Sequence, residues 1–219
     1  GISLATIIPI SFVGALSHFI FSQSETNLSY YALFIPCCII GTLVGKRFMK
    51  NFNSNILNLL FTLFLLLVGL KMLKVFDFSQ MFYGSFIDNL IINKYLLIST
   101  LGVILGVMSV LLGVGCGLLI VPFFVIVFGF DMHSAIKLSL TTMFFMTTSA
   151  SLVSKKINNI EIPLIRTLII PALVGAVLGA ITSTYMPATI LKQIFAFFLL
   201  SMVVKNMVKM VVNITITRN

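Results

Sequence analysis

The residues that offer chemistry most directly are glycines that interrupt the longest uncharged run of the sequence. The run from Tyr95 to Phe130 contains the polar or helix-breaking residues Ser109, Gly113, Gly115, Cys116, Gly117 and Pro122. A glycine inside a helix costs about 1 kcal/mol and a proline about 3 kcal/mol, so the run is predicted to break at the glycines. A helix that begins at Gly117 would point free backbone amides and its positive dipole end at this break, which predicts an anion site there.

Hydroxyl groups near two other runs are candidates to complete this site. Ser139 and Thr142 follow the glycine run, and Ser3 and Thr6 hold the corresponding places near the start of the chain. We expect these hydroxyls to donate to the anion from two sides. Lys137 either attracts the anion or extends from a helix start towards the membrane surface. The alternative is that the glycines allow close helix packing and the hydroxyls bond between helices.

The carboxylates are informative because of where they occur. All five lie in predicted loops, at Glu25, Asp77, Asp88, Asp131 and Glu161. We therefore expect no carboxylate inside the spans to bind a cation or carry a proton, and we predict neither a metal nor a cofactor. His18 and His133 lie near the ends of runs and are interpreted as interfacial. The three cysteines are interpreted as small buried residues and not as a disulfide framework.

The composition excludes most classes of soluble protein. The 219 residues are 59 % hydrophobic and 9 % charged, and their mean hydropathy is +1.17, whereas soluble proteins carry about 25 % charged residues. A soluble enzyme or a DNA-binding domain would need a polar surface that this chain lacks. No nucleic-acid partner is expected, and the lipid bilayer is. The net charge of +9 is interpreted as a record of membrane topology.

Long uncharged runs predict helices that cross the membrane, because hydrocarbon about 30 Å thick requires about 20 apolar residues of helix. The runs cover residues 1–24, 26–45, 51–70, 95–130, 138–154 and 167–191, and a last apolar helix follows over 193–204. The predicted fold class is all-α, a polytopic integral protein of the cell membrane. Residues 95–130 are predicted to enter and return, either as two spans or as a broken, re-entrant hairpin.

An internal repeat organises these runs. Residues 3–6 match 139–142, residues 35–36 match 170–171, and residues 56–57 match 190–191. Each repeat also carries a glycine pair, Gly41 with Gly45 and Gly175 with Gly179, spaced for close packing of helix backbones. The predicted division is a first repeat over 1–76, a connecting loop over 77–94, a second repeat over 95–213 and a tail over 214–219. Because the first repeat lacks a glycine hairpin, we expect a longer protein of about 255–260 residues.

The basic loops indicate that the two repeats are inverted. Lys46, Arg47 and Lys50 mark one cytoplasmic loop, and Lys155, Lys156 and Arg166 mark another, since short basic loops stay in the cytoplasm. The matching loops, residues 185–190 and 21–29, contain no Lys or Arg. Equivalent loops therefore face opposite sides, which is typical of inverted-repeat transporters. Lys71 and Lys74, at an outer helix end in this scheme, are the exception.

The order of these motifs resembles that of the TauE/SafE family of sulfite exporters, integral membrane transporters of sulfur-containing anions. The family pattern is similar to the segment from Ser109 to Gly117, then Val121-Pro122, then residues 135–140 and the Pro/Gly-rich residues 171–179. The chain departs from this pattern at Val110, Cys116, Lys137 and Leu138. These departures bear on the substrate more than on the fold.

The resemblance implies a permease that moves a small sulfur-containing anion, such as sulfite or an organosulfonate, by alternating access between the repeats. The expected partners are this anion and the bilayer, a homo-oligomer is left open, and no enzymatic activity is expected. Two alternatives remain. One is a non-transporting membrane subunit, and the other is a membrane thiol enzyme with Cys116 as nucleophile, although neither histidine is close to it in sequence.

Overall fold

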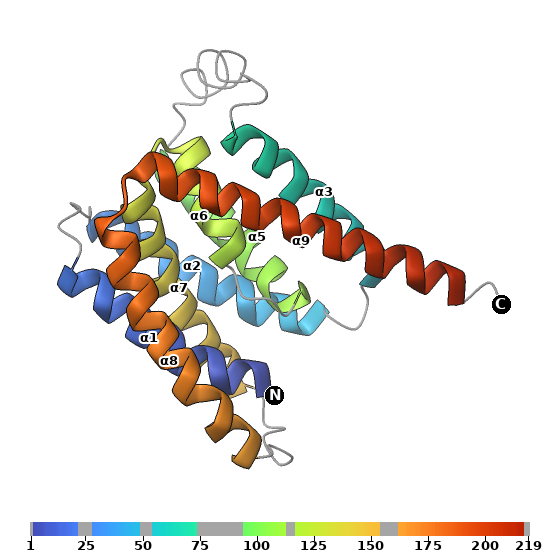
Figure 1. Cartoon of the computed structure of the whole chain (residues 1–219), viewed down its shortest axis with the longest axis horizontal. Helices are drawn as coiled ribbons and strands as arrows, with labels where there is room; N and C mark the ends of the chain where they lie inside the picture. The colour runs from blue at the N-terminus through green and yellow to red at the C-terminus, as the bar shows by residue number, and fades with distance from the viewer. Residues whose placement is uncertain are drawn as a thin grey trace. The chain divides into compact units, whose positions relative to one another are not determined.

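The computed structural model describes residues 2–21, 28–48, 54–73, 94–112, 117–153 and 162–216, which form α-helices and short turns. The helices are α1 (Ile2–Phe21), α2 (Leu28–Phe48), α3 (Ser54–Met72), α5 (Lys94–Leu112), α6 (Gly117–Val127), α7 (Met132–Val153), α8 (Ile162–Tyr185) and α9 (Ala188–Ile216) (Figure 1). No strand occurs in these ranges, and the predicted all-α class is confirmed for them.

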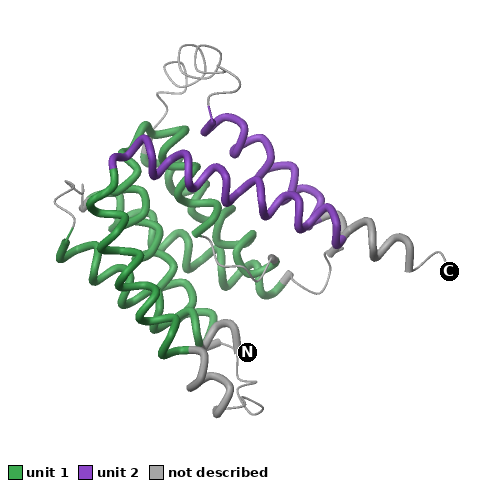
Figure 2. The backbone as a smooth tube through the Cα atoms, viewed as in Figure 1, with its two compact units in different colours: residues 1–50, 91–186 green, residues 51–90, 187–219 purple. Residues whose placement is uncertain are grey.

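The helices form two compact units, which are described separately (Figure 2). Unit 1 comprises residues 1–50 and 91–186 and contains α1, α2 and α5 to α8. Unit 2 comprises residues 51–90 and 187–219 and contains α3 and α9. Each unit takes helices from both predicted repeats. The units therefore do not coincide with the repeats, and the division at 1–76 and 95–213 stays a prediction.

Two helix boundaries differ from the limits of the uncharged runs. α7 begins at Met132 and not at residue 138, because Asp131 caps it and accepts the backbone N–H of His133 at 3.1 Å through Oδ2. The runs are separated at Lys192, whereas α8 ends at Tyr185 and α9 begins at Ala188. Pro187 lies between them, and proline has no N–H with which to continue a helix.

α1 and α7 pack against each other in opposite directions. The rings of Phe12 and Phe144 lie 5.2 Å apart. Further along α1 and earlier in α7, Leu140 lies 3.4 Å from the position that a Cβ on Gly14 would take. α8 also contacts α1, and α2 contacts α7. α1 and α7 are therefore one of several helix pairs that join residues 1–50 to residues 91–186 in unit 1.

α2 and α5 pack with their backbones almost in contact. A Cβ on Gly41 would collide with the carbonyl of Val103, and one on Gly45 would lie 2.8 Å from Val107 Cα. From the other side, a Cβ on Gly106 would collide with the carbonyl of Cys38. A Cβ on Gly102 would lie 2.9 Å from Cys37 Cβ, near the middle of α2, whereas Gly45, near its end, faces Val107, so the two helices run in the same general direction. The packing prediction is confirmed for Gly41 and Gly45.

The second glycine pair was predicted wrongly. A Cβ on Gly175 or Gly179 would meet no atom of the described chain within 4 Å. The neighbouring apolar side chains Ile170 and Leu178 are 63 % and 59 % exposed. This face of α8 is open and apolar, because no described helix covers it.

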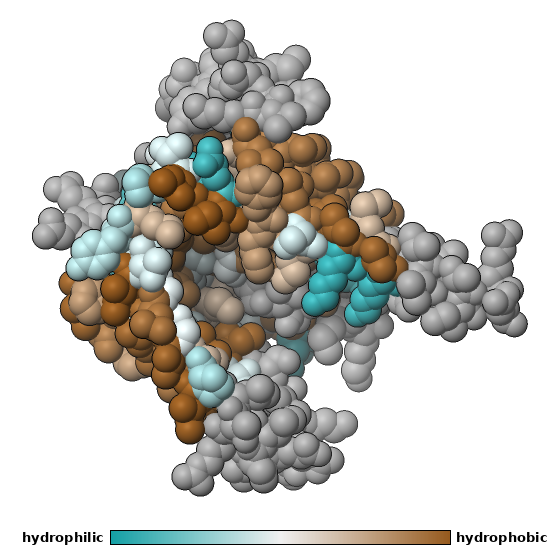
Figure 3. Space-filling view, in the orientation of Figure 1, coloured by the Kyte–Doolittle hydropathy of each residue, from teal (hydrophilic) through white to brown (hydrophobic). Residues whose placement is uncertain are grey.

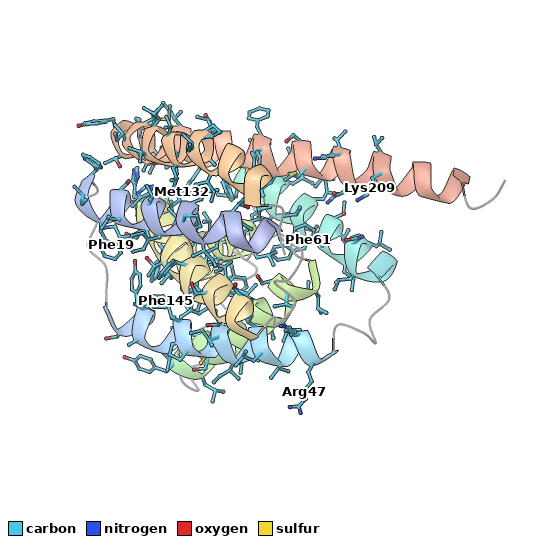
Figure 4. The ribbon with its side chains drawn as sticks, turned by 90° about the horizontal axis from the view of Figure 1, so that it is seen from below. Phe19, Arg47, Phe61, Met132, Phe145 and Lys209 are labelled. Atoms are coloured by element: carbon cyan, nitrogen blue, oxygen red, sulfur yellow. The ribbon has the colours of Figure 1, made fainter. Side chains whose placement is uncertain are left out.

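Unit 2 is a pair of apolar helices. Leu65 of α3 and Leu199 of α9 are fully buried, and Leu200 approaches to 3.1 Å of the position that a Cβ on Gly69 would take. Figure 4 labels Phe61 on α3 and Lys209 on α9. Phe61 is buried, so the contact between these helices extends over several turns.

Apolar side chains are conspicuous on the outside of the molecule, and Figure 3 shows them over much of one face. Ile20 and Phe197 are 67 % and 66 % exposed. Two described helices, Ser29–Arg47 and Ala188–Lys209, reach the length and hydropathy of a membrane span, and five shorter ones are also apolar. Surfaces of this kind contact lipid or other apolar partners and not water.

Candidate functional site

The run from Tyr95 to Phe130 forms one long helix and one half-length helix. α5 has 19 residues, about 28 Å, whereas α6 has 11 residues, about 16 Å. Hydrocarbon is about 30 Å thick, so α6 is too short to cross it. The choice between two spans and a re-entrant hairpin for this run stays a prediction.

The start of α6 lies against the middle of α7. The Oγ of Ser139 lies 3.5 Å from the carbonyl oxygen of Gly117, to which its hydroxyl donates a long hydrogen bond. Ser139 is 3 % exposed and lies seven residues, about 10 Å, into α7. The first backbone amides of a helix have no hydrogen-bond partner within that helix. The amides just after Gly117 and the hydroxyl of Ser139 are therefore donors in the same buried region.

Gly117 has room for a side chain. A Cβ at this position would lie 3.5 Å from Met143 Sδ and 3.6 Å from Ser139 Oγ, which are ordinary van der Waals distances. Helix packing in the described part of the chain therefore does not require glycine here, in contrast to Gly41.

Thr142 is a weaker donor than Ser139. Its hydroxyl is fully buried and donates to the carbonyl of Leu138 at 2.7 Å within α7. A hydroxyl has one proton, so either residue can donate to an anion only by giving up its present bond. The bond from Ser139 to the Gly117 carbonyl is the longer of the two, at 3.5 Å, so it is the easier one to give up.

The structure does not bring the hydroxyls at the start of α1 to this region. Because Phe12 faces Phe144 in an antiparallel pair, Thr6 lies level with residue 150, about 12 Å along the axis from Thr142. The side chain of Ser3, earlier in α1, lies outside the described residues. Ser109 is half-buried near the end of α5. Gly113, Gly115 and Cys116 also lie outside the described residues.

Lys137 lies on the opposite face of α7 from Ser139. Residues two apart in a helix point about 160° away from each other, and Lys137 Nζ lies 5.2 Å from the ring centre of Phe19 on α1. Lys137 is 3 % exposed, so it does not extend into water. The predicted site residues on α7 therefore belong to two separate places.

Lys137 belongs to a polar cluster at one end of unit 1, which we call the histidine end. There α1 and α8 finish and α2 and α7 begin. Nε2 of His18 lies 3.2 Å from Oγ of Ser183 on α8, and His18 is 2 % exposed. Phe19, the residue that follows His18, contacts Lys137 of α7. The interfacial interpretation missed this burial.

Sequence reasoning did not find Ser183 or Tyr31 as members of this cluster. Tyr31 of α2 lies beside Phe19, with 6.4 Å between their ring centres. The sequence did contain one signal. His18 lies at the end of α1 and His133 at the start of α7, its counterpart in the second repeat, and these two ends meet if the two helices pack antiparallel. In the described ranges no group of three His, Cys, Asp or Glu side chains is placed to hold a metal ion.

This fold and site define a class of protein: an all-helical membrane protein in which a half-length helix begins beside a buried hydroxyl. The family model of the sulfite exporter TauE/SafE matches residues 1–206. The chain therefore belongs to the TauE/SafE family and is a sulfite exporter-type membrane transporter. Comparisons with curated proteins and with solved structures gave no match.

Proposed function

We propose that the protein moves a small sulfur-containing anion, sulfite or a related sulfonate, across the cell membrane, and that the anion binds where α6 begins. The observation that carries the proposal is the half-length α6, whose first residue lies 3.5 Å from the buried Ser139 hydroxyl. Backbone amides and a hydroxyl can hold an oxyanion without a basic side chain. Gly113, Gly115 and Cys116, which precede α6 in sequence, are proposed to line the same site.

We propose alternating access between two inverted repeats as the mechanism. In the repeat scheme α1, α2 and α3 correspond to α7, α8 and α9. A contact between α1 and α8 should then have a counterpart between α7 and α2, and both contacts occur. The mates α1 and α7 run in opposite directions, as inverted topology requires. These features support the repeat division. We propose a multi-pass arrangement with Lys46 and Arg47 on the cytoplasmic side, because short basic loops stay in the cytoplasm.

The test uses purified protein in liposomes and measures uptake of radiolabelled sulfite. Ser139→Ala removes one donor to a charged ligand, worth about 1.5–3 kcal/mol, so the apparent affinity should fall about 10- to 100-fold. Gly117→Ala should also lower transport because a methyl group takes the ligand's space. Gly179→Ala is the matched control, since its Cβ meets no described atom within 4 Å.

The outcomes separate this proposal from its alternatives. Wild-type kinetics in Ser139→Ala and Gly117→Ala would contradict the site. A wild-type protein that moves no sulfite, thiosulfate or sulfonate but purifies with a fixed partner would favour the non-transporting subunit. The site would then be a packing feature only.

A further inference from the structure

The histidine end holds all the buried side-chain atoms that have no hydrogen-bond partner among the described residues. They are Nδ1 of His18, the hydroxyl of Tyr31 and Nδ1 of His133. Most buried polar side-chain atoms are hydrogen-bonded, and each exception requires an explanation. Three exceptions from three helices, α1, α2 and α7, share one end of one unit.

Ring contacts show that these helices meet at this end. Phe19 contacts Tyr31, with 6.4 Å between ring centres, and Tyr30 contacts Phe130 in the turn before α7 at 5.0 Å. Figure 4 shows Phe19 and Met132 at this end and Arg47 at the other end of α2. The three atoms therefore belong to one region.

The bonds of His18 define what its free nitrogen can do. The Ser183 hydroxyl donates to the carbonyl of Ala180 at 2.9 Å, so its oxygen accepts a hydrogen bond from His18 Nε2. Nδ1 is then the remaining polar atom of the ring, which is an acceptor in the neutral imidazole and an N–H donor only when the ring is protonated beside an anion. The Tyr31 hydroxyl is a second donor.

Basic side chains from two helices come together at this end. His133 and Lys137 lie four residues apart on α7, and Lys137 Nζ lies 5.2 Å from the ring centre of Phe19, the residue that follows His18 on α1. Asp131, the nearest carboxylate in sequence, is exposed and accepts the backbone N–H of His133 as the cap of α7. An anion would place acceptor oxygens beside the Tyr31 hydroxyl and a negative charge beside these basic side chains.

We propose that His18, Tyr31, His133 and Lys137 form a second oxyanion site, separate from the start of α6. Lys137 and Ser139 point away from each other on α7, so one anion does not contact both side chains. Lys46 and Arg47 place the far end of α2 in the cytoplasm, so this second site faces the outside. Its ligand class, the sulfur oxyanion, rests on the proposed function.

The test measures equilibrium binding of radiolabelled sulfite to the purified chain in detergent, in a Ser139→Ala background that weakens the α6 site. Tyr31→Phe removes only a hydroxyl without a described partner, so thermal stability should not fall. Sulfite affinity should fall about tenfold, the effect of one donor to a charged ligand. His133→Gln should also weaken binding. Tyr185→Phe is the matched control, because Tyr185 is 81 % exposed.

The results distinguish failure of this site from failure of the transport proposal. Sulfite binding that is unchanged in folded Tyr31→Phe and His133→Gln proteins overturns the second site, whatever the transport assay shows. Binding that depends on Tyr31 and His133, in a protein that moves no sulfur anion in liposomes, supports the site and refutes the proposed transport.

Discussion

The closest helix contact in the described structure makes a sharp stability prediction at Gly41. An alanine Cβ there would lie 2.9 Å from Val103 Cα and would collide with the Val103 carbonyl. Carbon atoms normally approach to about 3.5–4.0 Å, so α2 and α5 would have to separate by roughly 0.6–1.1 Å. Backbone atoms cannot turn aside as a flexible side chain can, and overpacking of this kind costs about 1–3 kcal/mol.

The assay is thermal unfolding of Gly41→Ala in detergent, with Gly175→Ala as the matched control. A loss of 1 kcal/mol lowers the Tm of a chain of this size by about 2–4 °C, so Gly41→Ala should melt about 2–12 °C below the wild type. Gly175 belongs to a glycine pair with the same spacing as Gly41 and Gly45, but it has open space around it. Gly175→Ala should therefore melt at or above the wild-type temperature. Equal melting temperatures for the two variants would refute the packing reasoning.

Two further predictions concern Cys116 and the start of α7. Cys116→Ser should retain sulfite transport in liposomes, because the proposal uses no thiol chemistry, and complete loss with normal folding would favour the thiol enzyme. Asp131→Ala should destabilise the protein by about 0.5–2 kcal/mol, because it removes the cap that accepts the His133 N–H at 3.1 Å. Unchanged thermal unfolding of Asp131→Ala would show that the cap contributes nothing.

Part of the candidate site could be predicted because it depends on local properties of the chain. A helix break between Ser109 and Gly117 follows from the cost of glycine in a helix, and a donor at Ser139 follows from its place on the next apolar run. The depth of Gly117 could not be predicted. It depends on how far α6 returns, which α2 and α7 determine through contacts such as that of Phe34 with Phe124, 4.9 Å between ring centres.

Hydroxyls that match in sequence did not converge in space. Thr6 and Thr142 hold equivalent repeat positions, yet antiparallel packing of α1 and α7 places them about 12 Å apart along the axis. The same packing brings Lys137 to Phe19, the neighbour of His18, and both His18 and Lys137 are buried. The sequence of each helix alone did not indicate this. Sequence reasoning placed residues on helices, whereas the direction of packing decided which of them meet.

The sequence by itself determined that the chain is all-helical and belongs in a membrane, because apolar runs and charge content are properties of single segments. It also contained the match to the TauE/SafE family over residues 1–206. Only the tertiary structure decided between glycine pairs of identical spacing. Gly41 faces the backbone of α5 and Gly175 faces open space, because the contact of a glycine depends on the helix beside it and not on its own sequence.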